Sequence, residues 1–326
     1  MNKKLLVTLI GGLFLIVLLL LVVAFWVWTQ LQPVSLESTE QKRFVVAKGQ
    51  SLIATANSLH EQGLIKQPQV FRYYSQFEKL DTNMQAGSYE LSPGMSTPEI
   101  ARALIQGTED VWITLPEGWR REEVAEYLAS QDLASFDDEE FLALTVDTEG
   151  YLFPDTYLVP REATADQLFN LLTGTFDQKV TIGLADELEA SQLSEQQVVT
   201  LASIVEREGR GETDMRHVAG ILLNRLDIGM ALETDATLQY IGGVNAKGEW
   251  WAPPSVSLKQ QVFPYNTYMF PGLPPGPIAN PGLAAVKAVL DPIESNDTFY
   301  IHDTSGVPHY AETLEEHNAN VNKYLR

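Results

Sequence analysis

Two glutamates, Glu206 and Glu208, follow an apolar stretch and are the side chains best placed for acid–base chemistry. A carboxylate beside apolar side chains loses part of its hydration, which raises its pKa. A carboxylic acid that stays protonated near neutral pH can act as a general acid. At about 100° per residue, the two glutamates lie on opposite flanks of the apolar stripe, so the helical wheel does not distinguish between them. The alternative, which periodicity alone favours, is that both mark the solvent-facing end of a buried helix.

The helix that must position these glutamates is predicted over residues 194–208. Ser194 is a favourable N-cap, and Gln197 takes the capping-box position three residues later. Apolar residues then recur at helical spacing, namely Val198, Leu201, Ala202 and Val205. A second helix with the same period is predicted over residues 214–226.

Composition narrows the classes of function. The 326 residues include 43 acidic and 22 basic side chains, for a formal charge of −21. Nucleic-acid-binding proteins gather Lys and Arg, so we expect no nucleic acid partner. The same charge argues against electrostatic docking on an anionic membrane surface. The chain has no cysteine, which rules out disulfides and thiolate metal sites.

Residues 5–28 form an apolar run without a charge that is long enough to span a bilayer. Trp26 and Trp28 stand at its far end, where an interfacial aromatic belt belongs. A cleaved signal peptide has a shorter apolar core and small residues at its cleavage site, which this run lacks. Because Lys3 and Lys4 precede the run, we expect a cytoplasmic tail over residues 1–4, an uncleaved transmembrane helix over 5–28 and a linker over 29–43.

Two segments that begin at Phe44 and Ile113 resemble each other at an offset of 68–69 residues. The aligned pairs are Gly49 with Gly118, Ala56 with Ala125, Leu59 with Leu128, Leu64 with Leu133, Tyr89 with Tyr157 and Leu104 with Leu172. Each copy is predicted to run strand, glycine turn, helix, helix, strand, helix. This suggests a duplicated module, with a chance likeness of βα patterns as the alternative.

The first copy, residues 44–108, also resembles the LysM class of glycan-binding modules. The resemblance rests on a strand, the turn Gly49-Gln50-Ser51-Leu52 and a helix. A small α+β packing module without a ligand is the alternative interpretation.

Residues 264–282, PYNTYMFPGLPPGPIANPG, contain too many prolines and glycines for a helix or a central strand. A rigid loop with aromatic and polar side chains suits a saccharide-binding wall. A stiff connector without a ligand is the simpler alternative. We expect residues 232–237 to be a loop or edge segment, and residues 243–257 to be an inserted loop.

The C-terminal part is predicted to hold a helix over residues 282–290, strands over 298–302 and 309–311, and a last helix ending near Leu325. His302, His309 and His317 lie in this part, but their spacing matches no metal-ligand motif. We therefore expect hydrogen-bonded histidines here, and neither a metal site nor a cofactor.

Together the motifs resemble the endolytic murein transglycosylase family, also called YceG-like. The motifs occur in family order: EGYLFPDTY (149–157), LASIVERE (201–208), NRLDIGMALETDAT (224–237), PYNTY (264–268), GLPPGPIANPG (272–282) and Glu316-His317-Asn318. Two departures are a long 243–257 stretch and Phe263, where a small residue is common.

The resemblance implies an enzyme anchored in the bacterial inner membrane, with its catalytic domain in the periplasmic or extracytoplasmic space. It implies cleavage of the bond between N-acetylmuramic acid and N-acetylglucosamine within peptidoglycan strands, leaving 1,6-anhydro ends and terminating or trimming nascent strands. Glycan strands, the membrane and peptidoglycan synthases are the implied partners. The catalytic role falls on Glu206. Motif membership alone makes six residues candidates for substrate binding: Glu208, Asp235, Tyr265, Asn266, Thr267 and Tyr268.

Two other classes of function stay open. A muramidase-type hydrolase needs a second carboxylate near the acid. A non-catalytic wall-binding scaffold needs only the LysM-like part. The predicted fold is α+β: an N-terminal transmembrane helix, a small LysM-like βα module over 44–108 and a mixed α+β catalytic domain over 109–326.

Overall fold

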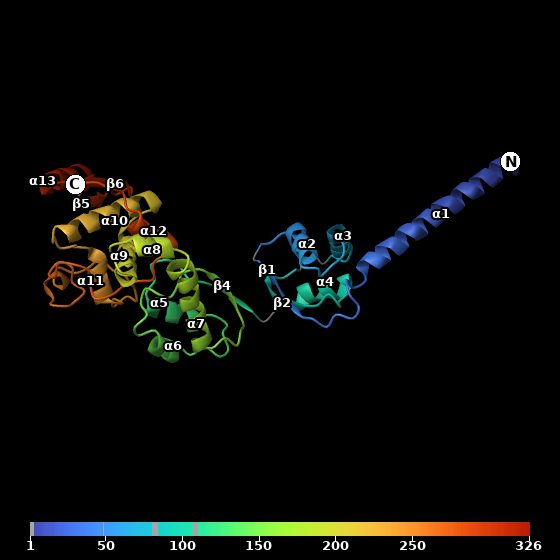
Figure 1. Cartoon of the computed structure of the whole chain (residues 1–326), viewed down its shortest axis with the longest axis horizontal. Coiled ribbons are helices and arrows are strands. Elements are labelled where there is room, and N and C mark those ends of the chain that lie inside the picture. The colour runs from blue at the N-terminus through green and yellow to red at the C-terminus, as the bar shows by residue number, and fades with distance from the viewer. Residues whose placement is uncertain (1–2, 48, 80–83, 107–109) are drawn as a thin grey trace. The chain divides into compact units, whose positions relative to one another are not determined.

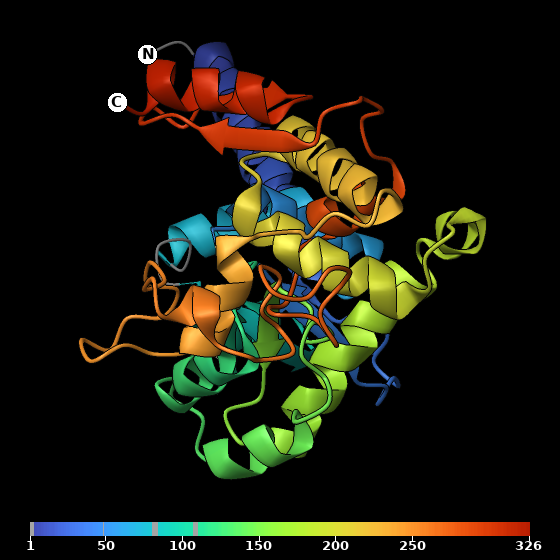
Figure 2. The ribbon, with the colours of Figure 1, turned by 90° about the vertical axis from the view of Figure 1, so that its left-hand side faces the viewer.

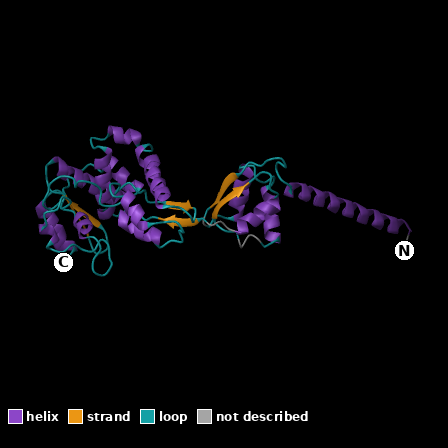
Figure 3. Ribbon diagram, turned by 90° about the horizontal axis from the view of Figure 1, so that it is seen from below, coloured by secondary structure: helices purple, strands orange, loops and turns teal. Residues whose placement is uncertain are grey.

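The computed structural model describes residues 3–47, 49–79, 84–106 and 110–326. It is a mixed α+β structure, mostly helical, whose strands pair in small antiparallel sheets (Figure 1, Figure 3). The predicted α+β class and the N-terminal apolar helix are confirmed at this level. Residues 1–2 of the expected tail and residues 107–108 of the expected first module lie outside the described residues.

The first unit comprises Met1–Trp112 and Leu158–Pro160. Its elements up to residue 106 are α1 (Lys3–Leu31), β1 (Lys42–Val46), α2 (Leu52–Glu61), α3 (Pro68–Phe77), β2 (Gly87–Leu91) and α4 (Thr97–Gln106). β1 pairs antiparallel with β2, with Phe44 opposite Tyr89. The alternating residues of these strands face a core shared with α2, α3 and α4, in which Leu59, Phe71 and Ile100 are buried.

Helix α1 carries the apolar segment Gly11–Leu31, whose most apolar window has no buried residue (Figure 1, blue). Its length and composition are consistent with a single membrane anchor or a signal sequence. The helix continues past the predicted end at residue 28, where the Thr29 hydroxyl donates to the Trp26 carbonyl at 2.7 Å. The connection that follows is tied to the first unit, because Ser35 N–H donates to Pro93 O and the Ser92 hydroxyl donates to Ser38 O.

The second unit comprises Ile113–Tyr157 and Arg161–Arg326. The remaining elements up to α9 are β3 (Val111–Thr114), α5 (Arg121–Ala129), α6 (Asp138–Leu144), β4 (Thr156–Val159), α7 (Ala165–Phe176), the π-helical turn η1 (Asp177–Thr181), α8 (Ala185–Ala190) and α9 (Glu195–Glu208). They are followed by α10 (Glu212–Asp227), α11 (Asp235–Gly242), the 3₁₀ turn η2 (Leu258–Gln260), α12 (Leu283–Leu290), β5 (Phe299–His302), β6 (Pro308–Ala311) and α13 (Leu314–Tyr324).

The element order of the two predicted repeats is confirmed, since β1-α2-α3-β2-α4 and β3-α5-α6-β4-α7 follow the same pattern. Both repeats turn on a glycine with positive φ, 78° at Gly49 and 76° at Gly118. In both, the aligned tyrosine donates its hydroxyl to the carbonyl four residues earlier, at 2.6 Å from Tyr89 and from Tyr157. Such matching detail supports duplication over a chance likeness.

The predicted capping box at the start of α9 is confirmed. Ser194 Oγ accepts from Gln197 N–H at 3.3 Å, and the Gln197 side chain accepts from Ser194 N–H at 2.9 Å. Every residue from Val198 to Val205 is buried. Because α9 is enclosed by α10 and α12 as well as by α11, it is the central helix of this unit (Figure 2).

One expectation is wrong: residues 235–237, expected in a loop or edge segment, begin helix α11. The Glu208 carboxylate accepts a hydrogen bond from Ala236 N–H at 3.3 Å, so a side chain from α9 caps this helix. The Thr237 hydroxyl also donates to Thr234 O at 2.9 Å. Because this cap comes from a distant part of the chain, the local sequence around residues 232–237 does not predict the start of the helix.

Candidate active site

Glu206 lies at the C-terminal end of α9, immediately after the last buried turn. Its carboxylate accepts a hydrogen bond from Gly282 N–H at 2.9 Å, and Gly282 is the N-cap residue of α12. Burial raises the pKa of Glu206 above the ordinary value of a glutamate, and the hydrogen bond from Gly282 opposes that shift only in part. Such a carboxyl can donate a proton and then hold the resulting negative charge on a backbone N–H.

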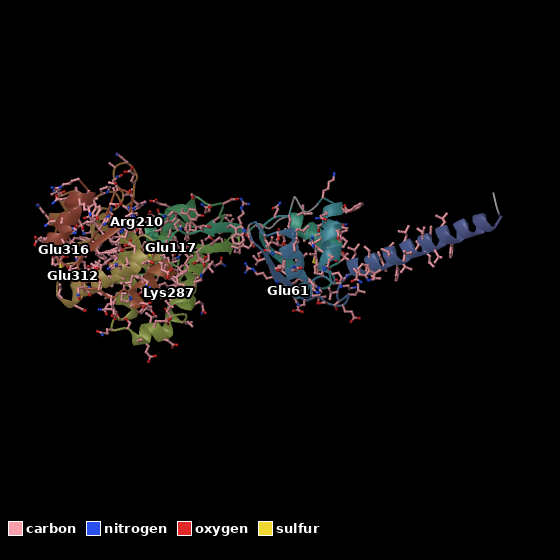
Figure 4. The ribbon with its side chains drawn as sticks, turned by 90° about the horizontal axis from the view of Figure 1, so that it is seen from above. Glu61, Glu117, Arg210, Lys287, Glu312 and Glu316 are labelled. Atoms are coloured by element: carbon pink, nitrogen blue, oxygen red, sulfur yellow. The ribbon has the colours of Figure 1, made fainter. Side chains whose placement is uncertain are left out.

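Glu117, an exposed residue, is the carboxylate next to Glu206, and the sequence analysis did not identify it (Figure 4 labels it). Its side chain occupies the space in front of Gly282, where a Cβ on residue 282 would collide with it. The negative charge of Glu117 also raises the pKa of Glu206. Glycine at position 282 therefore allows both the N–H contact to Glu206 and the approach of Glu117.

The turn of the second repeat forms the other wall of the site. A Cβ on Gly118 would stand 3.4 Å from Glu206 Cγ and 3.3 Å from the Arg207 side chain. Arg207 donates to Gly118 O at 3.4 Å, and its guanidinium lies 4.0 Å from the centre of the Trp251 ring. The turn of the second repeat and helix α9 are thus in direct contact at Glu206.

Asn280 holds these segments together. It is 1% exposed, and its backbone exchanges hydrogen bonds with the turn: Gly118 N–H donates to Asn280 O and Asn280 N–H donates to Trp119 O. The Asn280 side-chain oxygen accepts from Gly150 N–H at 3.0 Å and Leu152 N–H at 2.9 Å. The GLPPGPIANPG motif therefore fixes the EGYLFPDTY loop and the Gly118 turn beside the start of α12.

Glu149, the first residue of EGYLFPDTY, is a second buried carboxyl. One of its oxygens accepts from Arg121 N–H at 3.0 Å, and the other has no hydrogen-bond partner among the described residues. Burial raises the pKa of Glu149 to about 8. Glu149 therefore binds its proton near neutral pH, and through Asn280 it adjoins the segment that contacts Glu206.

Glu208 faces away from this site. Besides capping α11, it accepts a hydrogen bond from the Tyr300 hydroxyl at 3.1 Å. Burial raises the pKa of Glu208 as well. Its contacts join α9 to α11 and to the β5–β6 hairpin, which is a positioning role.

Three of the predicted substrate-binding residues, Glu208, Asp235 and Tyr268, meet around one pocket of about 380 Å³. The Tyr268 hydroxyl donates to Asp235 at 2.7 Å and accepts from Lys259 at 3.0 Å. Arg225 lies on the same pocket and donates to Leu232 O at 2.6 Å. Glu233, also in its wall, has a φ of 50°, a strained conformation for a residue other than glycine.

The other three predicted substrate-binding residues lie elsewhere. Asn266 is fully buried, and its side chain bonds the backbone of residues 258–261. Thr267 is 2% exposed and bonds the hydroxyls of Thr234 and Thr237. Tyr265 packs its ring 5.1 Å from that of Tyr240. The PYNTY motif thus packs against the start of α11, where Thr267 bonds Thr234 and Thr237, and it contributes Tyr268 to the pocket.

The inserted loop over residues 243–257 folds back on α5. Trp250 donates its indole N–H to Glu126 at 3.1 Å, and Trp251 donates to Glu123 at 2.7 Å. Trp251 adopts a φ of 60° and faces the Arg207 guanidinium. The half-buried Trp251 ring is therefore fixed beside Arg207, the residue that follows Glu206, whereas the Trp250 ring lies 4.8 Å from the Arg120 guanidinium.

The three C-terminal histidines have separate partners. His302 bonds Asp214 at 2.8 Å, His309 bonds Asp303 at 3.1 Å, and His317 packs its ring 5.2 Å from that of Phe299. Within the described residues, no three of the His, Asp and Glu side chains are arranged to hold a metal ion.

Comparison with known proteins adds the following likenesses. Residues 44–323 match the model of the YceG-like family. An endolytic murein transglycosylase of Streptococcus pneumoniae is 26% identical over 346 residues, which cover 92% of this chain and 61% of that protein. The chain therefore spans less than two thirds of the length of this relative.

Two further proteins are similar along most of their length. An endolytic murein transglycosylase of Bacillus subtilis is 29% identical over 324 residues, which cover 90% of this chain and 88% of that protein. The crystal structure of a protein described as yceG-like from Listeria monocytogenes superposes with a TM-score of 0.55 at 28% identity, covering 86% of this chain and 99% of that one.

Proposed function

The chain belongs to the YceG-like family, and on this premise we propose that it is a membrane-anchored lytic transglycosylase that cuts peptidoglycan glycan strands internally. The observation that carries the proposal is the Glu206 carboxyl, which has a raised pKa and a backbone N–H beside it. The names of the streptococcal and bacillar relatives support the substrate class.

In the proposed mechanism, Glu206 protonates the oxygen between N-acetylmuramic acid and N-acetylglucosamine. The bond to the muramic C1 breaks, and an oxocarbenium-like state develops at that carbon. The C6 hydroxyl of the same sugar attacks C1 and gives its proton to the Glu206 carboxylate. A 1,6-anhydro end forms, Glu206 regains its proton, and no water is consumed.

The surroundings of Glu206 suit both halves of this cycle. Burial and the charge of Glu117 favour the protonated acid that the first step needs. The Gly282 N–H stabilises the carboxylate that exists between the two steps. A nucleophile on the same sugar is already held near C1, which gives it a high effective concentration.

We propose that Asp235 and Tyr268 contact glycan from the pocket that they line with Glu208. Asn266 and Thr267 are proposed to act by holding that loop, because their polar groups bond within the chain. Tyr265 is proposed to contact substrate at the aromatic pair with Tyr240. The Trp251 ring supplies a further stacking surface near Arg207.

We further propose that residues 44–108 form a LysM-like glycan-binding module, since β1, α2, α3 and β2 run strand, helix, helix, strand with antiparallel pairing. Residues 109–326 are the proposed catalytic domain. α1 is proposed as a single-pass anchor in the inner membrane, with the rest of the chain in the periplasmic or extracytoplasmic space. There the enzyme would terminate or trim nascent strands, with peptidoglycan synthases as proposed partners.

A muramidase-type hydrolase is the second candidate, and the position of Glu117 is the observation that favours it. An inverting hydrolase uses a second carboxylate to activate water on the far side of the sugar. Glu117 is the acid beside Glu206. The other nearby acids are engaged elsewhere: Glu208 and Asp235 line the pocket that contains Tyr268, and Asp214 bonds His302.

Glu206→Gln tests the proposed catalytic role. The amide keeps the size of the side chain and accepts from Gly282 N–H but supplies no proton, so turnover on purified glycan strands should fall roughly 10²–10⁴-fold. The melting temperature and glycan binding should stay close to those of the parent chain. Turnover that survives the substitution would contradict the catalytic role of Glu206, whereas a parent chain that binds glycan without turnover would favour the scaffold class.

Glu208→Gln is the matched control. Ala236 N–H and the Tyr300 hydroxyl bond different oxygens of Glu208, and the amide keeps only one of these acceptors, so stability should fall by about 1–3 kcal/mol. Activity should fall less than in Glu206→Gln. If Glu208→Gln is the more damaging change to turnover in protein that remains folded, the assignment of the catalytic role to Glu206 is wrong.

A further inference from the structure

The outer end of α1 packs directly on the first unit. Val27 and Leu31 are partly buried there, and the Lys66 ammonium donates to Thr29 O at 3.2 Å. Together with the bonds that Ser35 and Ser38 make to the β2–α4 turn, these contacts fix α1 to the unit without a free stalk. If the end of α1 lies at a given depth in a bilayer, the face of the first unit that packs against it must lie at the same depth.

An apolar pocket of about 370 Å³ opens where α1 meets α3. It is lined by Trp26, Val27 and Leu31 from α1, and by Gln69, Val70, Tyr73, Tyr74 and Phe77 from α3. Tyr73 is 73% exposed and Phe77 is 84% exposed, whereas Phe71, on the opposite face of α3, is 1% exposed. Tyr73 and Phe77 are four residues apart, so they lie on one face of α3.

We propose that this face of α3 sits in the interfacial layer of the same bilayer that α1 enters, with lipid filling the pocket. This inference rests on the proposed membrane anchor. Trp26 and Trp28 stand at the end of the apolar span, which is the depth of an aromatic belt. Tyr73 and Phe77 share a pocket with Trp26 and therefore reach the same depth.

The chemistry of the surface fits lipid. An amphipathic helix at an interface inserts its apolar and aromatic face between headgroups and acyl chains. A chain with a formal charge of −21 gains little from anionic headgroups, so apolar contact must supply the attraction. Two membrane contacts, α1 and α3, would fix the orientation of the first unit on the surface, which one spanning helix alone does not do.

The absence of cysteine makes a direct test available, since one introduced cysteine takes one label. The full chain carrying Phe77→Cys is labelled with an environment-sensitive fluorophore and reconstituted in phospholipid vesicles. We expect blue-shifted emission that is quenched by lipids spin-labelled near the headgroup. The matched control is Val45→Cys, because Val45 is 43% exposed on β1. This strand lies at the end of the first unit away from α1 (Figures 1 and 3). Its label should keep aqueous emission.

A label at Leu20→Cys, in the middle of the apolar span, separates the two proposals. Quenching at Leu20 by deeply spin-labelled lipid, with none at Phe77, would overturn the docking of α3 and leave the anchor intact. Quenching at neither site would overturn the anchor. A blue shift at Phe77 that spin-labelled lipid does not quench would also overturn the proposal. If that shift depends on protein density, a second copy covers this face; if it depends on added glycan strands, a glycan does.

Discussion

At the scale of the residue, one position separates two glutamates with different surroundings. Glu206 faces Gly282, Gly118 and Glu117, whereas Glu208 faces the start of α11 and Tyr300. Two residues along a helix rotate the side chain by about 200°, so the opposite flanks predicted from the wheel are the ones the structure has. The wheel did not show which flank meets a backbone N–H and a second acid.

Glu117→Gln tests the influence of that second acid. Its negative charge raises the pKa of Glu206, so the neutral amide should let that pKa fall. Less Glu206 is then protonated at neutral pH. The alkaline limb of the kcat/KM profile, which reports the essential acid in the free enzyme, should therefore move to lower pH while activity on the acid side is retained.

Glu162→Gln, an exposed carboxylate in the second unit, is the control and should leave the profile in place. An unmoved alkaline limb in Glu117→Gln would mean that the two carboxylates do not interact. A complete loss of turnover at every pH would instead point to Glu117 as the activating base of a hydrolase.

At the scale of the element, the site is a meeting of the end of α9, the start of α12 and the turn before α5. Gly282 donates its backbone N–H to Glu206 and, because it has no Cβ, leaves room for the Glu117 side chain. Gly282→Ala should push the Glu117 side chain away and displace the N–H from Glu206. A displacement on the order of 1 Å can cost about 10²-fold in rate, so we expect a loss of that size in kcat/KM.

Gly174→Ala is the matched substitution, because a Cβ at position 174 meets open space within α7. It should leave kcat/KM unchanged and stabilise the fold by about 0.5–1 kcal/mol. The φ of Gly282 is −75°, so alanine there carries no backbone penalty and any loss is steric. Full activity in Gly282→Ala would show that the site accommodates a Cβ at position 282 without disturbing catalysis, and would contradict the steric role given to this glycine.

Much of this architecture could be predicted from local pattern. The capping box and buried period of α9 were visible, and so were the repeat order and its two positive-φ glycines. Helix α11 was missed because its cap, Glu208, is 28 residues away. Glu117 was missed because its contact with Gly282 brings distant segments together. Asn266 looked like a ligand contact because polarity alone does not reveal a buried side chain bonded to its own loop.

At the scale of the whole molecule, the chain matches the YceG-like family over residues 44–323, and the apolar helix α1 before this region is consistent with a single membrane anchor or a signal sequence. Lys3 and Lys4 precede the apolar run, which predicts a cytoplasmic amino terminus. A reporter that is active only in the cytoplasm, fused after Arg326, should therefore stay silent in intact cells, while one active only outside should give signal. The opposite pattern would contradict access to the wall.

We propose that one carboxyl, Glu206, acts first as the acid and then as the base, with a hydroxyl of the substrate as the nucleophile. The most direct measurement is mass spectrometry of products formed from purified glycan strands in ¹⁸O-labelled water. We expect 1,6-anhydro ends, no ¹⁸O and no new reducing ends, with product formation lost in Glu206→Gln. Products that carry ¹⁸O at the muramic C1 would contradict it, would make the protein a hydrolase, and would direct the search for the second carboxylate to Glu117.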